Sequence, residues 1–397
     1  MAESAQKASF RNSSILPIIY IIGLLGLASY NMLVAVMPLY VSKLGGSVSE
    51  VGLIVAVNAY CTALFLIPFG LLSDKFGRRT FLLSGLIIVT IVPFLYIFST
   101  TLLQLAILRV LHGIASATFV PNLMASVIDM SPAEQKGKAI GWYTTATQSG
   151  LMIGPIFGGF LLSNFSFEIA FISSGIIALI TLIIASIRFH VVPRKETVKL
   201  DLEASWSWLK QKALYGALLS PLVMLFGVGT LSAYIPLYVQ DFGISATGAG
   251  LIITLCYASS AALRVTAGSM SDRIGRKPMI LGGLLLSIIM MALIPQFNSL
   301  VLLSIISFCY GIGYGILQPS GIALTSDLSP RKNLGLAASM LASAVHVGQA
   351  LGPTAMGAVA EMTNLSTMFI ACALSMVLGW LIIIVLFRIE RKKGSAL

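Results

Sequence analysis

Four ionisable side chains lie inside long apolar stretches of this sequence. They are Arg109, His112, Arg264 and His346. A charge within an apolar membrane segment is costly and usually has a function, and histidine titrates near physiological pH. Arg109, His112 and Ser116 are spaced so that a helix places them on one face. Arg109, His112 and His346 are therefore candidates for proton coupling, with a packing role as the alternative for each histidine.

The same stretches contain no aspartate or glutamate near their middle; the fourteen acidic residues lie in tails, loops or at the ends of the stretches. A cavity that holds Arg109 and Arg264 would then be neutral or positive. It should favour neutral, zwitterionic or anionic ligands, or amphiphiles bound by apolar contact. The polar candidates for lining it are Tyr30, Asn31, Ser116, Asn122, Ser232, Tyr234, Tyr310, Tyr314 and Gln318. Helix packing is the alternative for each tyrosine.

The elements that must position these residues are membrane helices. The 397 residues are 57% hydrophobic and 10% charged, with mean hydropathy +0.95. Apolar runs of about twenty residues are typical of membrane-spanning helices. Twelve such runs predict an all-α integral membrane protein. They cover residues 15–41, 51–72, 79–98, 102–128, 138–163, 167–189, 213–238, 249–270, 278–297, 300–326, 334–360 and 367–387.

The net charge of +11 follows membrane topology and does not indicate nucleic-acid binding. Lys43 is the only basic residue in a predicted outer loop, and most others lie in the tails or in alternate loops. The positive-inside rule places those loops and both termini in the cytoplasm, in a cell membrane with anionic lipids as neighbours. The four cysteines are scattered without metal spacing, so we expect neither a metal site nor a cofactor.

An internal repeat organises the chain. An offset of 198 residues aligns Gly, Pro and Asp positions of the two halves, such as Pro38 with Pro236 and Asp74 with Asp272. This predicts two parallel six-helix units, residues 1–189 and 213–397, as in transporters that rock about a central site.

A linker, residues 190–212, joins the two units. Leu202, Trp206 and Leu209 have helical spacing. This predicts an amphipathic helix in the membrane interface, with Trp206 and Trp208 at headgroup level. A solvated linker is the alternative.

Each half carries a cluster of charges at its predicted inner end. The loop Gly70–Arg79 and its copy Gly268–Lys277 contain an aspartate among basic residues, and another aspartate ends a later span. Ion pairs in such clusters could latch one of two conformations, or simply anchor the topology. The residues are Asp74, Arg78, Asp129, Asp272, Arg276 and Asp327.

Small residues recur every four positions in the fifth span. Ala146, Gly150, Gly154 and Gly158 form a stripe that lets another backbone approach closely. Pro155 removes one helical hydrogen bond. We expect this stripe at a moving seam between the two halves; ordinary close packing of one helix is the alternative.

These motifs resemble those of the major facilitator superfamily over nearly the whole chain. Gly70–Arg79 and its copy resemble the family's signature loop. The run from Arg109 to Gly113 resembles its fourth-helix motif, associated with proton coupling. The fifth span resembles the motif of drug:proton antiporters with twelve spans, through Gly141, Gly150, Gly154, Pro155, Gly158 and Gly159. The resemblance implies two pseudo-symmetric six-helix bundles, an inner gate formed by the charged clusters, and a monomer.

These observations predict a secondary active transporter and not an enzyme. The expected function is proton-coupled export of small lipophilic or amphiphilic compounds by alternating access, with a proton gradient as the energy source. The alternative is an uncoupled facilitator, or a flippase for lipids or metabolites, of the same fold. A membrane-embedded enzyme or receptor finds no support, because the sequence has no His/Glu metal spacing, nucleophile elbow, phosphate loop or signalling domain.

Overall fold

A computed structural model of the protein describes residues 2–132, 135–189, 208–330 and 333–394. Within these residues it contains twelve long helices and no strand. The first six are α1 (Ala2–Lys43), α2 (Val48–Phe76), α3 (Arg78–Tyr96), α4 (Leu102–Met130), α5 (Lys136–Asn164) and α6 (Phe167–Arg188). The others are α8 (Lys212–Tyr238), α9 (Ala246–Ile274), α10 (Arg276–Leu293), α11 (Leu300–Leu328), α12 (Leu334–Met362) and α13 (Leu365–Gly394). Short 3₁₀ turns, η2 (Val239–Phe242) and η3 (Ile294–Gln296), follow α8 and α10.

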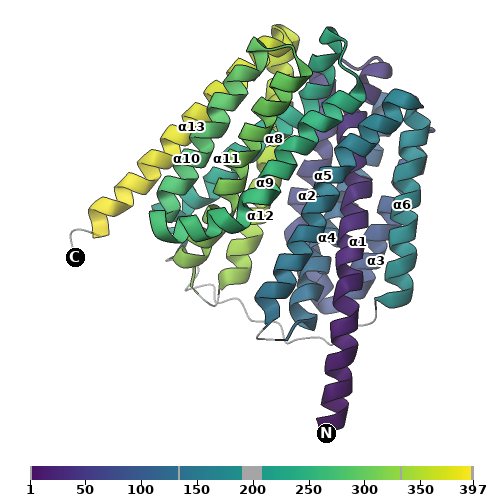
Figure 1. The fold of residues 1–397 in the computed structure, drawn as a ribbon, viewed down its shortest axis with the longest axis vertical. Coiled ribbons are helices and arrows are strands. Elements are labelled where there is room, and N and C mark those ends of the chain that lie inside the picture. Colours follow the sequence, from purple (N-terminus) through teal and green to yellow (C-terminus); the bar gives the residue numbers. More distant parts are fainter. Residues whose placement is uncertain (1, 133–134, 190–207, 331–332, 395–397) are drawn as a thin grey trace.

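The predicted fold class, twelve helices in two six-helix bundles, is confirmed. Among the described residues, eleven helices are long and apolar enough to cross a membrane. The twelfth, α5, is rich in Gly, Thr and Ser, which lowers its hydropathy, but its 29 residues extend about 43 Å at 1.5 Å per residue. Figure 1 shows α1 to α6 on one side of the molecule and α8 to α13 on the other.

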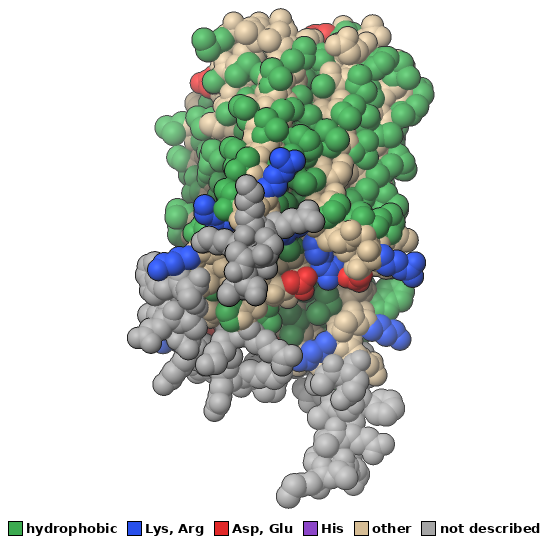
Figure 2. All heavy atoms as spheres, turned by 90° about the vertical axis from the view of Figure 1, so that its left-hand side faces the viewer, with side chains coloured by type: hydrophobic (Ala, Val, Ile, Leu, Met, Phe, Trp, Pro, Cys, Tyr) green, Lys and Arg blue, Asp and Glu red, His purple; other side chains and the backbone are tan. Residues whose placement is uncertain are grey.

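Both termini lie at the same end of the two bundles (Figure 1). The helix ends there carry Arg78, Lys136, Lys212 and Arg276, and we call it the basic end. Figure 2 shows Lys and Arg side chains gathered below a band of mostly hydrophobic side chains. The hydrophobic band matches a surface that faces lipid.

Local signals explain where the helices begin and turn. Ser47 caps α2, and its capping box is completed by Glu50. Gly77 and Gly275 join α2 to α3 and α9 to α10 with φ of 100° and 102°. Only glycine adopts such values readily, so each half makes the same tight turn at the same repeat position.

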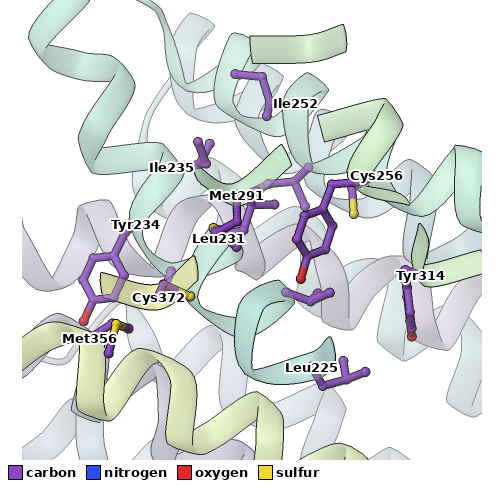
Figure 3. Close-up of a cluster of buried hydrophobic side chains, with 14 of the residues drawn as sticks. Leu225, Leu231, Tyr234, Ile235, Ile252, Cys256, Met291, Tyr314, Met356 and Cys372 are labelled. Atoms are coloured by element: carbon purple, nitrogen blue, oxygen red, sulfur yellow. The ribbon is translucent and has the colours of Figure 1, made fainter. Parts of the chain in front are cut away.

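The core of the C-terminal bundle forms around α8, which is the most buried candidate span of the described chain. Side chains from α9, α10, α11, α12 and α13 pack around it. Figure 3 labels part of this cluster: Leu225, Leu231, Tyr234, Ile235, Ile252, Cys256, Met291, Tyr314, Met356 and Cys372.

The two halves meet along two helix pairs, α2 with α12 and α5 with α9. Away from the basic end the backbones touch: a Cβ added at Gly52 would overlap Pro353, and one at Gly250 would overlap Pro155. At the basic end, a Cβ on any of five glycines would meet no described residue within 4 Å: Gly70, Gly137, Gly141, Gly268 and Gly335. The seam is therefore tight at the opposite end and loose at the basic end.

The glycine stripe of α5 was expected to face the other half of the molecule, but it faces α1. Added Cβ atoms at Gly150, Gly154 and Gly158 would overlap the backbone of α1, which belongs to the same half. The motif residues that approach the other half are Pro155, which lies against Gly250, and Gly159, which lies against Ala246; both partners belong to α9. Successive residues of a helix differ by 100° in direction, so neighbouring glycines contact different helices. The stripe fixes α1 to α5 and does not form the seam.

The predicted interfacial helix of the linker lies mainly outside the described residues. Trp208, which is described, is buried inside the protein and does not face the lipid headgroups. Its side chain is buried against Leu214 and Ala337, because the start of α8 and the start of α12 together form a pocket for the indole ring.

The α1–α5 contact predicts a sharp difference between two glycines of one helix. Gly158→Leu should lower the thermal unfolding temperature strongly, because a side chain there meets the Met32 carbonyl group and overpacking costs about 1–3 kcal/mol or more. Gly141→Leu, with open space around it, is the matched control and should unfold like the wild type. Equal unfolding temperatures for the two purified variants would contradict this packing.

Candidate functional site

A small cavity of about 60 Å³ lies between the two halves. The N-terminal half contributes residues from α1, α2 and α4, and the C-terminal half contributes residues from α8, α9 and α12. The lining consists of Tyr30, Asn31, Leu33, Val34, Met37, Val55, Asn58, Ala59, Arg109, Gly229, Ser232, Tyr257 and Gln349. Four predicted residues, Tyr30, Asn31, Arg109 and Ser232, are thus brought together.

Arg109 is the charged residue of this cavity, and only 8% of it is exposed. Its Nε donates to the Ile54 carbonyl oxygen at 3.3 Å and its Nη2 to the Val55 carbonyl oxygen at 2.9 Å. Both acceptors belong to α2, so the guanidinium group fixes α4 against α2. Among the described residues, no carboxylate forms an ion pair with Arg109.

His112 lies one turn further along α4 and is fully buried. Its Nδ1 is 3.2 Å from the Tyr96 hydroxyl oxygen, and the edge of the Tyr30 ring packs against it with centroids 4.7 Å apart. Its Nε2 is buried without a hydrogen-bond partner in the structure. A neutral imidazole donates from one nitrogen and accepts at the other, so this site has capacity for one more hydrogen bond or proton.

Asn58 and Tyr96 complete this group, and the sequence analysis missed both. The Tyr30 hydroxyl donates to Asn58 Oδ1, while Tyr96 contacts His112. The available signal was the same as for Tyr30 and Asn31: a polar side chain within an apolar span. What the sequence could not supply was the direction in which each side chain points.

Arg264 of α9 forms a second polar group between the halves. The side-chain amide of Gln148, in α5, lies against its guanidinium group; with the amide oxygen turned toward Arg264, it accepts from Nη1 at 2.7 Å and from Nε at 3.0 Å. The Tyr314 ring centroid is 5.8 Å from the Arg264 guanidinium carbon. The guanidinium group therefore contacts the opposite half and does not extend to the membrane interface. Gln148 belongs to the fifth-helix motif region but was not predicted as a site residue.

The other predicted cavity residues lie elsewhere. Asn122 is buried and donates to the Thr118 carbonyl of its own helix. Tyr310 is fully buried in the C-terminal core and donates to Met224. Tyr234 donates to the Pro353 carbonyl across the α8–α12 contact at 2.8 Å. None of these lines the cavity.

Three further candidates, Ser116, Gln318 and His346, do not line the cavity either. Ser116 is buried on the face of α4 that carries Arg109. Gln318 of α11 and His346 of α12 are half-buried, and Gln318 Oε1 has no hydrogen-bond partner among the described residues.

The charged clusters at the basic end form ion pairs within each half. Arg78 Nη1 is 2.9 Å from Asp129 Oδ2 and Nη2 is 3.3 Å from Asp74 Oδ1, joining α2, α3 and α4. In the other half Arg276 pairs with Asp272 at 2.5 Å and Asp327 at 3.0 Å. Asp129 has 12% of its side chain exposed and Asp327 57%. The N-terminal network is therefore the better shielded from solvent.

At the opposite end, each half caps a helix of the other. The Ser49 amide, in the first turn of α2, donates to Glu361 Oε2 of α12 at 3.0 Å. The Thr247 amide, in the first turn of α9, donates to Ser163 Oγ of α5 at 2.9 Å. Both pairs are related by the 198-residue repeat. First-turn amides lack intrahelical acceptors, so these caps exist only while this end stays closed.

Two six-helix bundles around a polar cavity, closed at one end and loose at the other, define the architecture of a membrane transporter. The chain belongs to the Major Facilitator Superfamily, whose family model matches residues 19–240 and 217–397. Its helices, repeat and central cavity are those expected of that fold.

Relatives of the chain carry transporter names. It is 27% identical over 375 residues to the multi-drug resistance efflux pump PmrA of Streptococcus pneumoniae, covering 91% of this chain and 93% of that protein. It is 25% identical over 378 residues to the quinolone resistance protein NorA of Staphylococcus aureus, covering 91% and 94%.

Solved structures share the fold. The occupied, inward-facing bacterial homologue of the human lysosomal transporter Spinster has a TM-score of 0.80 at 16% identity, covering 95% of this chain and 97% of that chain. The nucleoside transporter NupG has a TM-score of 0.79 at 16% identity, covering 94% and 99%.

The crossed caps predict that Glu361 stabilises closure of its end. Glu361→Ala should raise the rate at which an impermeant maleimide, added at that end, labels a cysteine at Val34 in a cysteine-free background. We expect a two- to fivefold increase, because an exposed cap is worth about 0.5–1 kcal/mol.

Glu50→Gln is the matched control for this experiment. Glu50 accepts from Ser47 at 2.8 Å and caps the same helix, but from within its own half. Its replacement should leave the labelling rate unchanged. An unchanged rate in Glu361→Ala, or an equal increase in Glu50→Gln, would contradict the assignment.

Proposed function

We propose that the protein is a proton-coupled exporter of small lipophilic or amphiphilic compounds that works by alternating access. The observation that carries this proposal is the asymmetric seam around the Arg109 cavity. One end is held by backbone contacts and by the crossed caps. At the basic end, added Cβ atoms on the five glycines Gly70, Gly137, Gly141, Gly268 and Gly335 would meet no described residue within 4 Å. Rocking of the two halves would open the closed end while it closes the basic end, and would so expose the cavity to each side of the membrane in turn.

The positive-inside rule assigns the basic end to the cytoplasm, with both termini there and the protein in the cell membrane. The structure then corresponds to the state that faces inward. Residues 1–189 and 213–397 are the two moving units. The charged clusters of Arg78 and Arg276 would meet the opposite half when the basic end closes, and so act as its gate. A monomer contains all of these parts.

Export of amphiphilic compounds is supported by the relatives, which are named as a multi-drug resistance efflux pump and a quinolone resistance protein. Proton coupling is supported by His112. Its Nε2 has no hydrogen-bond partner among the described residues, so this nitrogen can accept a proton. A conformational change that gives this nitrogen access to water would favour proton uptake, and proton binding would favour that conformation in return.

Everted membrane vesicles with an acid interior test this function. Lipophilic compounds of cationic, neutral and anionic classes would be added, and proton release recorded with a pH-sensitive dye. We expect release with at least one class, loss of release in His112→Gln, and normal release in the control Lys138→Gln, an exposed cation at the basic end.

Two results would contradict the proposal. Compound movement that persists with an uncoupler and causes no proton release would favour a facilitator or flippase. Normal proton release in His112→Gln would remove His112 from the coupling mechanism.

A further inference from the structure

We propose that the Arg109 cavity binds a monovalent anionic group, either a carboxylate or a halide ion, between the two halves. Four observations support this site: an uncompensated buried cation, an unused hydrogen-bond donor, the size of the cavity, and its position at the seam.

The first observation is that the Arg109 guanidinium group is a buried cation without a neutralising partner among the described residues. Arg109 is 8% exposed and its hydrogen bonds go to the Ile54 and Val55 carbonyls. Carbonyls within a helix already accept helical hydrogen bonds, and they carry no net charge to neutralise the guanidinium group. A buried charge is stabilised well only by an opposite charge with matching hydrogen bonds. Within the described chain no carboxylate pairs with Arg109, so that position is left for a ligand.

Asn58 supplies the unused donor. Its Oδ1 accepts from the Tyr30 hydroxyl. Its Nδ2 is buried with no hydrogen-bond partner among the described residues, although Asn58 lines the cavity. The Ser232 hydroxyl, from the other half, faces the same cavity and is also without a partner there. A guanidinium group, an amide NH₂ and a hydroxyl together form a donor set suited to an acceptor with negative charge.

The volume restricts the ligand. The cavity holds about 60 Å³, whereas sites that enclose drug-sized molecules measure about 300–1,000 Å³. A carboxylate or a halide ion fits this space, and the rest of an amphiphile does not. The site is therefore an anchor for one charged group, and the apolar part of a larger ligand would lie outside it.

Because the site lies between the two halves, an anion bound there would influence how the halves are arranged. Arg109 and Asn58 belong to one half and Ser232, Tyr257 and Gln349 to the other. A bound anion attracts both sides and stabilises the conformation in which they are close. This consequence rests on the proposed transport cycle, whereas the anion site itself does not.

Thermal unfolding of the purified protein in nanodiscs tests the site. Sodium sulfate, whose anion is divalent and carries no carboxylate, would be replaced at constant ionic strength by sodium chloride, formate or benzoate, with neutral benzamide as a further control. A ligand of the folded state raises the unfolding temperature as its concentration increases. We expect the temperature to rise with at least one of the three small anions and not with benzamide. Benzoate stronger than chloride identifies a substrate carboxylate as the source, and chloride alone identifies a halide ion.

Variants connect the effect to the cavity. Arg109→Gln should remove the anion-dependent rise. If that variant does not fold, Asn58→Asp provides a second test: it retains the acceptor for Tyr30 but places a carboxylate beside Arg109, so the half-saturating anion concentration should increase at least tenfold. Lys138→Gln, which removes an exposed cation at the basic end, should respond like the wild type.

The proposal is overturned if no anion raises the unfolding temperature of the wild type, if benzamide acts as well as benzoate, or if the rise persists in Asn58→Asp. These outcomes are separate from those of the vesicle assay. If anions raise the unfolding temperature but no compound causes proton release, the anion site is supported and coupled transport is contradicted. If compounds cause proton release but no anion raises the unfolding temperature, coupled transport is supported and the anion site is contradicted.

Discussion

The close approach of helix backbones across the seam determines most of this structure. In lipid, burying apolar side chains gives little drive for association, so contact depends on close packing and interhelical hydrogen bonds. Gly52 against Pro353 and Gly250 against Pro155 supply the close packing. The caps on Ser49 and Thr247 supply the hydrogen bonds. These contacts are concentrated at one end, which leaves the basic end free and encloses the Arg109 cavity between them.

The charged side chains are also arranged differently at the two ends of the molecule. At the opposite end a carboxylate of one half caps a helix of the other, and at the basic end the ion pairs stay within each half. Between the ends lie Arg109 and Arg264, which contact only neutral groups among the described residues. The pathway therefore has an excess of positive charge at its centre. This arrangement differs from a cavity with an embedded carboxylate, which would attract cations.

The sequence was sufficient for the features that depend on local, repeated chemistry. Apolar length predicted the twelve helices, and the 198-residue offset predicted two equivalent bundles. The same offset relates the glycine turns at Gly77 and Gly275 and the caps at Glu361 and Ser163, although the caps themselves were not foreseen. Repeated local chemistry could be read because each copy depends on residues close together in the chain.

The rest depended on helix rotation, which the sequence does not specify. The stripe of Gly150, Gly154 and Gly158 was assigned to the seam, but a rotation of 100° per residue decides whether α1 or α9 receives it. Because helix rotation was unknown, the role of Asn58 and the contact between Gln148 and Arg264 were not predicted. Trp208 was misplaced because its partner, Ala337, lies far along the chain. The roles of the candidate site residues in transport remain proposals.

Paired distance measurements across the two ends test alternating access most directly. Spin labels would be placed at Thr145 and Met270, near the basic end of α5 and α9, and in a second sample at Leu44 and Phe242, near the opposite end. Both samples would be studied in nanodiscs across a pH step and with a lipophilic dye. The account predicts opposite changes: when the basic-end distance shortens, the other lengthens. Distances that change in the same direction, or one end that opens while the other stays fixed, would contradict it.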